Sequence, residues 1–266
     1  MKNIQHSTFN IQRRTAGAAG AASKLEKPLE VECSTLNVEC SPWLLLNSGS
    51  CAPAFNMALD EALLEAMPRL QKPVLRFYGW TESAASFGYF QKFAEVERAT
   101  LLRPLVRRPT GGGIVPHDAD WTYSLAFPAG HEWYSLKAVD SYRRVHEGIQ
   151  QAFAKLNVAT ELAPGCKKSA PGQCFVGHEK SDLLWLGKKI AGAAQRRTRE
   201  GLLIQGSVQP PSLPLSRVDW QEAMGGVARA GWGSVGVNWV PDTLLIQRVK
   251  ELIREKYANT AYHQKR

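Results

Sequence analysis

Two arginines, three consecutive glycines and a histidine-aspartate pair lie within the twelve residues 107–118. Glycine has no Cβ, so the backbone N–H groups of Gly111–Gly113 can approach an anionic or carbonyl oxygen closely. Arg107 and Arg108 would place fixed positive charge beside that oxygen. We therefore interpret the segment as an anion-binding turn, with a plain hairpin as the alternative.

The flanks of this turn indicate which elements it joins. Leu105-Val106 leads into the turn and Ile114-Val115 leads out of it, as expected for two strands. This arrangement argues against a Walker loop, which needs a Gly-Lys-Ser/Thr sequence at the start of a helix.

A second candidate segment runs from Ser181 to Arg197. Its apolar run, Gly-Lys turn and second run predict a β-hairpin. Alternation with a period of two places Lys189, Ala191 and Ala193 on one face. Small side chains beside a lysine would leave a groove in which a thin acyl tail could lie. The alternative is a lysine at a solvated turn above small core residues.

With a third segment, these two resemble the family of lipoate–protein ligases and octanoyl-protein transferases. The resemblance rests on three motifs in order: Phe-Asn-Met-Ala-Leu-Asp-Glu at 55–61, Arg-Arg-x-Thr-Gly-Gly-Gly-x-Val-x-His-Asp at 107–118, and Gly-Lys-Lys-Ile-Ala-Gly-x-Ala-Gln at 187–195. It spans about residues 43–208, and three motifs in order are far more specific than one glycine run. The resemblance implies attachment of an octanoyl or lipoyl group to one lysine of a lipoyl domain.

The resemblance also implies roles for single residues. Lys189 matches the family's invariant active-site lysine, whereas Arg108, Gly113 and His117 match positions that line its acyl or acyl-adenylate pocket. The predicted substrate-binding residues are Arg108, Thr110, Gly111, Gly112, Gly113, His117, Asp182 and Gly192. No metal site is predicted, because Cys166, Cys174 and His178 match no standard zinc spacing.

Cys174 bears on the choice between two activities. Cys174-Phe175 followed by Asp182-Leu183 resembles the cysteine-dependent octanoyltransferases, whereas ligases of the family generally lack a cysteine there. The favoured hypothesis is an octanoyltransferase without a cofactor, in which Cys174 accepts the acyl group from an acyl carrier protein and Lys189 stabilises the thiolate. The alternative is a ligase that uses ATP and Mg²⁺ to make an acyl-adenylate. A lesser alternative is a non-catalytic acyl-binding regulator.

Several positions near these motifs leave alternatives open. His117 either moves a proton or is a hydrogen-bonded structural residue, and Asp118 is expected to orient it or to cap the next turn. Gln205 stands where the transferases often have a histidine, and Pro116 replaces a usually larger apolar residue. Either departure could alter acyl-chain preference or the acceptor that is recognised.

Composition restricts the partners and the compartment. Thirty-three basic against 24 acidic residues give a net charge of +9, nearly all of it after residue 41, and such a surface attracts acidic partners. No nucleic-acid motif appears, so the expected partners are an acyl carrier protein and lipoyl domains, such as the glycine cleavage H protein or the E2 of a 2-oxoacid dehydrogenase. Five cysteines, an odd number, favour a reducing cytoplasm over a disulfide framework. No membrane association is expected, because no run of eighteen apolar residues occurs.

Periodicity predicts the order of the elements. Residues 1–41 are expected to be a disordered extension, with a transit peptide as the alternative, and residues 42–260 to form one catalytic domain. Besides the hairpin, strands are expected at 43–46, 74–80, 85–88, 105–108, 122–127 and 202–208, and helices at 53–68, 93–99, 135–156 and 242–257. Strands in runs, without regular βαβ alternation, favour an α+β fold with a mixed, largely antiparallel sheet and packed helices. The biotin/lipoate ligase-like catalytic domain implied by the resemblance has such a sheet.

Overall fold

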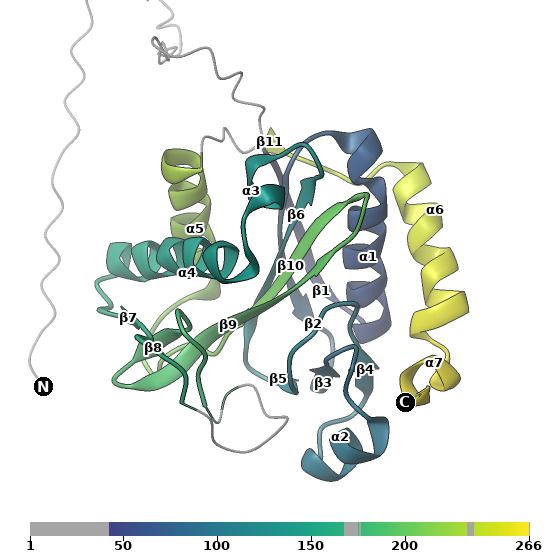
Figure 1. Ribbon diagram of the computed structural model, residues 1–266, viewed down its shortest axis with the longest axis horizontal. Helices are drawn as coiled ribbons and strands as arrows, with labels where there is room; N and C mark the ends of the chain where they lie inside the picture. The colour runs from purple at the N-terminus through teal and green to yellow at the C-terminus, as the bar shows by residue number, and fades with distance from the viewer. Residues whose placement is uncertain (1–42, 168–174, 176, 233–236, 266) are drawn as a thin grey trace, which may run out of the picture. The chain divides into compact units, whose positions relative to one another are not determined.

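The computed structural model describes residues 43–167, 175, 177–232 and 237–265, and these build a sheet covered on both faces by helices (Figure 1). The main sheet has eight strands in the order β11-β1-β2-β6-β10-β9-β8-β7. They are β1 (Leu44–Cys51), β2 (Val74–Trp80), β6 (Trp121–Pro128), β7 (Glu161–Leu162), β8 (Leu183–Trp185), β9 (Lys188–Arg197), β10 (Gly201–Val208) and β11 (Val237–Asn238). Strand β1 pairs in parallel with β2 and β11, and the other pairs are antiparallel. The predicted mixed, largely antiparallel α+β sheet is therefore confirmed.

Helices cover the two faces because their apolar stripes match those of the strands. Helices α4 (Ala138–Lys155) and α5 (Arg217–Gly231) bury Ile149, Phe153 and Trp220 against one face. Helices α1 (Pro53–Leu70) and α6 (Thr243–Leu252) bury Leu59 and Val249 against the other, as the two sides of Figure 1 show. Each large apolar side chain that is fully buried contributes about 1.5–3 kcal/mol. None of the helices within the described ranges is long and apolar enough to cross a membrane.

A second, smaller sheet carries the glycine turn. Its strands β3 (Ala84–Phe87), β4 (Leu105–Arg107) and β5 (Val115–His117) lie in the order β4-β3-β5, and α2 (Phe93–Ala99) follows β3. The turn joins two strands, as predicted, but they lie on opposite sides of β3, so the plain hairpin is wrong. Gly112 adopts a φ of 86° in this crossing, which favours glycine. A Cβ atom at Gly88 would lie 1.9 Å from the Gly112 carbonyl oxygen, so the glycine turn packs directly on the backbone of the loop that follows β3.

Two predicted helix boundaries are wrong for identifiable reasons. Pro68 lies inside α1 rather than ending it, because the last turn is completed by the Gln71 N–H, which donates to the Met67 carbonyl at 3.0 Å. The helix expected over 135–156 is α4, which begins three residues later because Leu136 and Lys137 are extended; the short α3 (Glu132–Ser135) precedes it. Val139 in the first turn of α4 is 54 % exposed, whereas Val145, Ile149 and Phe153 of the same helix are buried.

The sequence prediction also omitted elements of the C-terminal part. Helix α5 was not predicted, nor was the short turn α7 (Thr260–Gln264). The helix expected over 242–257 is confirmed in outline: Asp242 caps α6, which continues into the π-helical turn η1 (Ile253–Tyr257). Helix α7 returns the chain to the outer edge of β4.

Candidate active site

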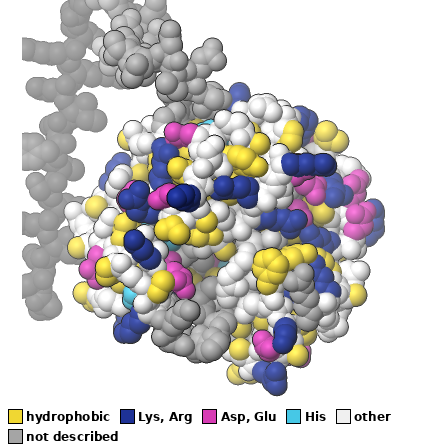
Figure 2. Space-filling model, in the orientation of Figure 1, with side chains coloured by type: hydrophobic (Ala, Val, Ile, Leu, Met, Phe, Trp, Pro, Cys, Tyr) yellow, Lys and Arg dark blue, Asp and Glu magenta, His cyan; other side chains and the backbone are white. Residues whose placement is uncertain are grey.

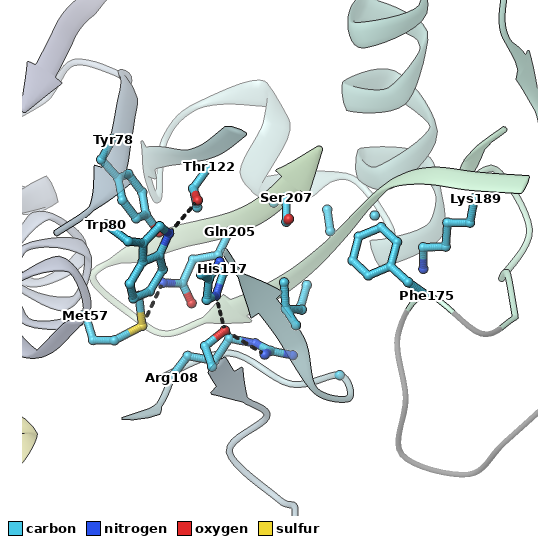
Figure 3. Close-up of a pocket in the computed structure, with 17 residues that line it drawn as sticks. Met57, Tyr78, Trp80, Arg108, His117, Thr122, Phe175, Lys189, Gln205 and Ser207 are labelled. Carbon is cyan, nitrogen blue, oxygen red and sulfur yellow. Dashed lines mark hydrogen bonds between the residues drawn. The ribbon is translucent and has the colours of Figure 1, made fainter. Parts of the chain in front are cut away.

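A cavity of about 60 Å³ lies between the main sheet and the small sheet. Strands from both sheets contribute to its lining, and apolar or small side chains dominate. Figure 3 shows Lys189 and Phe175 together at one end of the lining side chains, with Met57, Tyr78 and Trp80 at the other. The cavity therefore has Lys189 at one end and apolar side chains at the other, and Arg108 adds a second cation to its lining.

Lys189 is held at this end by an ion pair. Its Nζ lies 2.7 Å from an Asp182 carboxylate oxygen, and only 9 % and 8 % of the two side chains are exposed. The same Asp182 oxygen accepts the Glu179 N–H at 2.7 Å, which fixes the carboxylate. Lys189 Nζ also lies 5.2 Å from the centre of the Phe175 ring, within the range of a cation–π contact.

Gly192 leaves the space that this lysine occupies. A Cβ atom at Gly192 would lie 2.6 Å from Lys189 Cε and 2.8 Å from Nζ, closer than real Cβ contacts. The predicted site residues Asp182, Lys189 and Gly192 thus form one unit: a carboxylate, an ammonium and a position without a side chain.

The predicted face of strand β9 is wrong, because the strand contains a bulge. Leu183 pairs with Ala191 but Leu184 pairs with Lys189, which leaves Ile190 as the extra residue. Lys189 therefore shares the cavity face with Gly192, whereas Ala191 is buried in the core on the opposite face. A bulge reverses the alternation beyond it, and no residue type in the sequence marks this one.

Arg108 closes the glycine turn on itself. Its guanidinium donates to the carbonyl oxygens of Gly111 (2.9 and 2.5 Å) and Gly113 (2.8 Å). It also donates to the Ser86 hydroxyl at 3.3 Å. The side chain is buried and lines the cavity, so its charge faces the site while it fixes the turn.

Arg107, in contrast, is not part of the cavity lining. Its side chain is fully buried, and its guanidinium donates to the backbone carbonyls of Tyr89 (2.8 Å), Gln91 (2.7 Å) and His263 (2.6 Å). The expectation that both arginines place charge at the turn holds for Arg108 alone, because neighbouring residues of a strand point to opposite sides.

His117 is oriented by Asp120 rather than by Asp118. Its Nδ1 lies 2.9 Å from an Asp120 oxygen, and its Nε2 lies 2.8 Å from the Ser86 hydroxyl. Asp118, which was expected to orient the ring or cap the turn, is exposed. The imidazole also stacks on Trp80, with ring centres 3.8 Å apart. His117 is thus a firmly held wall of the cavity, with both ring nitrogens engaged.

Thr110 reaches the site through a buried network that the sequence did not reveal. Its hydroxyl donates to the Gln205 side-chain oxygen at 2.7 Å, and the Gln205 amide donates to Asp60 at 2.7 Å. Asp60 also accepts from Arg76 at 2.6 Å and from the Tyr78 hydroxyl at 3.0 Å. The sequence signal for this network was the Asp-Glu pair at the end of the first motif. Its aspartate, Asp60, connects α1 with β2 and, through Gln205, with the glycine turn.

Two titratable groups near Asp182 are held in their neutral forms. Burial raises the pKa of the Tyr123 hydroxyl, and the negative charge of Asp182 adds to this. Burial lowers the pKa of His146, whose Nδ1 donates to the Ser181 carbonyl at 2.6 Å, while Asp182 partly opposes the shift. The Asp182–Lys189 pair therefore lies beside two buried groups that are neutral.

The predicted nucleophile, Cys174, lies outside the described residues, but its neighbour Phe175 lines the cavity. Cys166 and His178, which were considered with Cys174 as metal ligands, have other partners. Cys166 donates to Glu179, and His178 bonds to the Gly165 carbonyl. Within the described ranges, no three His, Cys, Asp or Glu side chains are grouped so as to hold a metal ion.

The mixed sheet, the glycine turn and the lysine-ended cavity define an α+β protein with a candidate small-molecule site between its two sheets. The chain belongs to the lipoyl protein ligase A/B catalytic domain family, whose model matches residues 52–209, more than half of the sequence. The predicted family is therefore confirmed.

Two relatives agree with this family. The chain is 37 % identical over 179 residues to octanoyltransferase LipM of Lysinibacillus sphaericus, covering 62 % of this chain and 65 % of that protein. It is 37 % identical over 181 residues to LipM of Bacillus subtilis, covering 62 % of this chain and 64 % of the relative. The matched region thus spans less than two thirds of the length of these relatives.

The fold matches that of lipoate–protein ligases at low identity. Lipoate–protein ligase A bound with ATP superimposes with a TM-score of 0.68 at 20 % identity, covering 84 % of this chain and 98 % of that one. A bipartite lipoate protein ligase from Thermoplasma acidophilum gives 0.65 at 18 % identity, covering 84 % and 96 %.

Proposed function

We propose that this protein transfers an octanoyl group to a specific lysine of a lipoyl domain. The observation that carries the proposal is the cavity with a buried, ion-paired Lys189 at one end of an apolar lining. An apolar lining of this kind suits an acyl chain, whose carbonyl carbon would lie beside the ammonium. The similarity to octanoyltransferases named LipM supports the same activity.

Cys174 is the proposed nucleophile. Its Sγ attacks the thioester carbonyl of the donor; a new C–S bond forms, and the donor's thiolate leaves and takes up a proton. The acceptor lysine, as a free amine, then attacks the Cys174 thioester; an amide forms, the Cys174 thiolate leaves, and the proton lost by the amine passes to solvent or to that thiolate. The position of Phe175 in the cavity lining supports a role for the preceding residue.

Lys189 is the proposed electrostatic partner of both steps. Its ammonium would stabilise the Cys174 thiolate and the oxyanion that develops on the carbonyl oxygen. Asp182 keeps the ammonium in place, and Gly192 leaves room for it. Arg108 and the turn that it closes would form the opposite wall, with His117 and Thr110 holding that wall through Ser86 and Gln205.

The proposed donor is an octanoyl-acyl carrier protein, and the proposed acceptor is the lipoyl domain of an H protein or an E2 subunit. The net charge of +9 supports acidic partners of this kind. Lysine and arginine side chains are spread over the face seen in Figure 2, with smaller groups of acidic side chains between them. No cofactor is required by this route, since the thioester is already activated.

Intact mass of a lipoyl-domain acceptor tests the proposal. One reaction contains octanoyl-carrier protein without ATP, and the other contains free lipoate with ATP and Mg²⁺. Modification in the first alone supports the transferase; modification in the second alone overturns it in favour of the ligase. If neither reacts, the acyl-binding regulator becomes the better account.

Matched variants then test the residues. Cys174→Ala and Lys189→Met should abolish transfer. Cys166→Ala and Lys188→Ala should leave it unchanged, because Cys166 and Lys188 are exposed residues outside the cavity lining. Transfer by Cys174→Ala at the wild-type rate would overturn the thioester route.

A further inference from the structure

The outer edge of β4 is covered by the C-terminal turn α7 (Figure 1). Among the strands that the structure describes, β4 pairs only with β3, so its other edge would expose backbone N–H groups. The Arg107 N–H on that edge donates to His263 Nδ1 at 3.1 Å. The His263 side chain thus accepts a hydrogen bond from an edge N–H of β4, the strand that leads directly into the glycine turn.

The hydrogen bonds of His263 define its tautomer. Nδ1 accepts the Arg107 N–H, and Nε2 lies 3.0 Å from the Tyr257 carbonyl oxygen, which can only accept. The ring is therefore neutral with its hydrogen on Nε2. Burial lowers the pKa of His263; the Tyr257 hydrogen bond opposes this, and the charges of Arg107 and Lys265 lower it further.

The same turn also holds the Arg107 side chain. The His263 carbonyl accepts from the guanidinium at 2.6 and 3.3 Å, and that guanidinium reaches across to the Tyr89 and Gln91 carbonyls. Lys265 Nζ lies 4.2 Å from the centre of the Tyr89 ring. The C-terminal turn therefore fixes both β4 and the loop after β3.

These two segments are the ones on which the glycine turn rests. The Tyr89 N–H donates to the Thr110 carbonyl at 2.9 Å, and Gly88 packs against the Gly112 carbonyl. Arg108, which closes the turn, follows Arg107 directly and donates its N–H to the Phe87 carbonyl at 3.0 Å. A shift of β4 or of this loop would move the cavity wall.

We propose that His263 is a positioning residue of the acyl site: by capping the edge of β4 and holding Arg107, it fixes the glycine turn in the position that binds the acyl donor. This role deepens the proposed acyl transfer and rests on it for its kinetic test. His263 itself does not line the cavity, so its effect reaches the site only through Arg107 and the turn.

Two substitutions separate the contact from simple packing. In His263→Asn, the side-chain oxygen stands as many bonds from Cα as Nδ1 does, so it can still accept the Arg107 N–H. In His263→Gln, the amide group stands at the position of Nε2, so it keeps the Tyr257 contact and loses the Arg107 contact. Gln264→Ala, an exposed position of the same turn, is the control.

The expected result is a KM for octanoyl-carrier protein raised about tenfold in His263→Gln, as for a buried N–H that loses its acceptor, with kcat changed less than about twofold. His263→Asn and the control should stay close to wild type. Equal defects in the Asn and Gln variants, or an unchanged KM in the Gln variant, would overturn the proposal.

Hydrogen exchange of the backbone amides in residues 107–113 provides a readout that needs no activity. Exchange should accelerate about tenfold in His263→Gln, and not in His263→Asn. If the wild-type protein transfers no acyl group but the Gln variant exchanges faster, the positioning role stands and the acyl-transfer proposal fails. Unchanged exchange in the Gln variant would refute the positioning role whatever the activity.

Discussion

The pocket made by Gly192 for Lys189 permits a sharp prediction for Gly192→Ala. The added Cβ would lie 2.6 Å from Lys189 Cε, whereas carbon atoms in contact are about 3.5–4.0 Å apart. The lysine side chain must therefore move by about 1 Å. The ammonium now lies 2.7 Å from Asp182, so a displacement of this size breaks the ion pair or removes the charge from the reacting carbonyl.

A misplacement of about 1 Å in a catalytic site can reduce the rate about 100-fold, and we expect a loss of this order in octanoyl transfer. The cost in folding stability should be only about 1–3 kcal/mol, as for other overpacked positions. The assay is the initial rate of acceptor modification by intact mass, with urea unfolding measured on the same samples.

Gly130→Ala is the control, since a Cβ at Gly130 would meet no atom within 4 Å. Transfer by Gly192→Ala within about twofold of the wild-type rate would refute the reasoning, because the lysine would then be able to move without consequence. A loss of activity that merely follows unfolding would also contradict it, and the urea titration detects that outcome.

Three further predictions concern buried polar groups. Asp60→Asn leaves the fully buried Arg76 guanidinium without its anionic partner and should destabilise the fold by about 3–5 kcal/mol in urea unfolding; less than about 1 kcal/mol would be inconsistent with this. Gln205→Ala removes the bridge between Asp60 and Thr110 and should raise the KM for the donor with little change in kcat; a purely kcat effect would contradict a positioning role. Burial lowers the folded-state pKa of His146, so the stability that this residue contributes is present above the unfolded pKa of about 6.5. As the pH falls below that value, the free energy of unfolding should decrease by at most about 1.4 kcal/mol per pH unit. This pH dependence should flatten in His146→Gln, and an unchanged slope would argue against the role of His146.

Much of the main sheet could be predicted because its strands are strongly apolar and clearly bounded. The strand over 74–80 has the bounds that its β-branched and aromatic run predicted. Helix α5 was not predicted, because glycines at 225, 226 and 231 lower its intrinsic propensity. Its stability comes instead from tertiary packing, since Trp220 and Met224 are fully buried in the core.

The site was predicted less completely than the fold. The glycine turn, His117 and Lys189 were assigned to one cavity, and the structure brings them together. Their partners were not predictable, because they depend on backbone geometry: the β9 bulge exchanges Ala191 for Gly192 beside the lysine, and the turn after β5 selects Asp120 over Asp118. The contact between Arg107 and His263 joins positions 156 residues apart, and no local pattern encodes it.

The cavity has one wall from the eight-stranded sheet and another from the three-stranded sheet. Most of the buried apolar surface belongs to the large sheet and its helices, whereas the cluster under the small sheet is limited to a few side chains around Phe87 and Val96. A substitution in the small sheet should therefore lower the free energy of unfolding less than a substitution in the large sheet. Substitutions of Val115, which lines the cavity from the small sheet, should therefore cost less folding stability than substitutions in the wall that carries Lys189. Libraries that vary the cavity would accordingly start at Val115 rather than at the wall that carries Lys189.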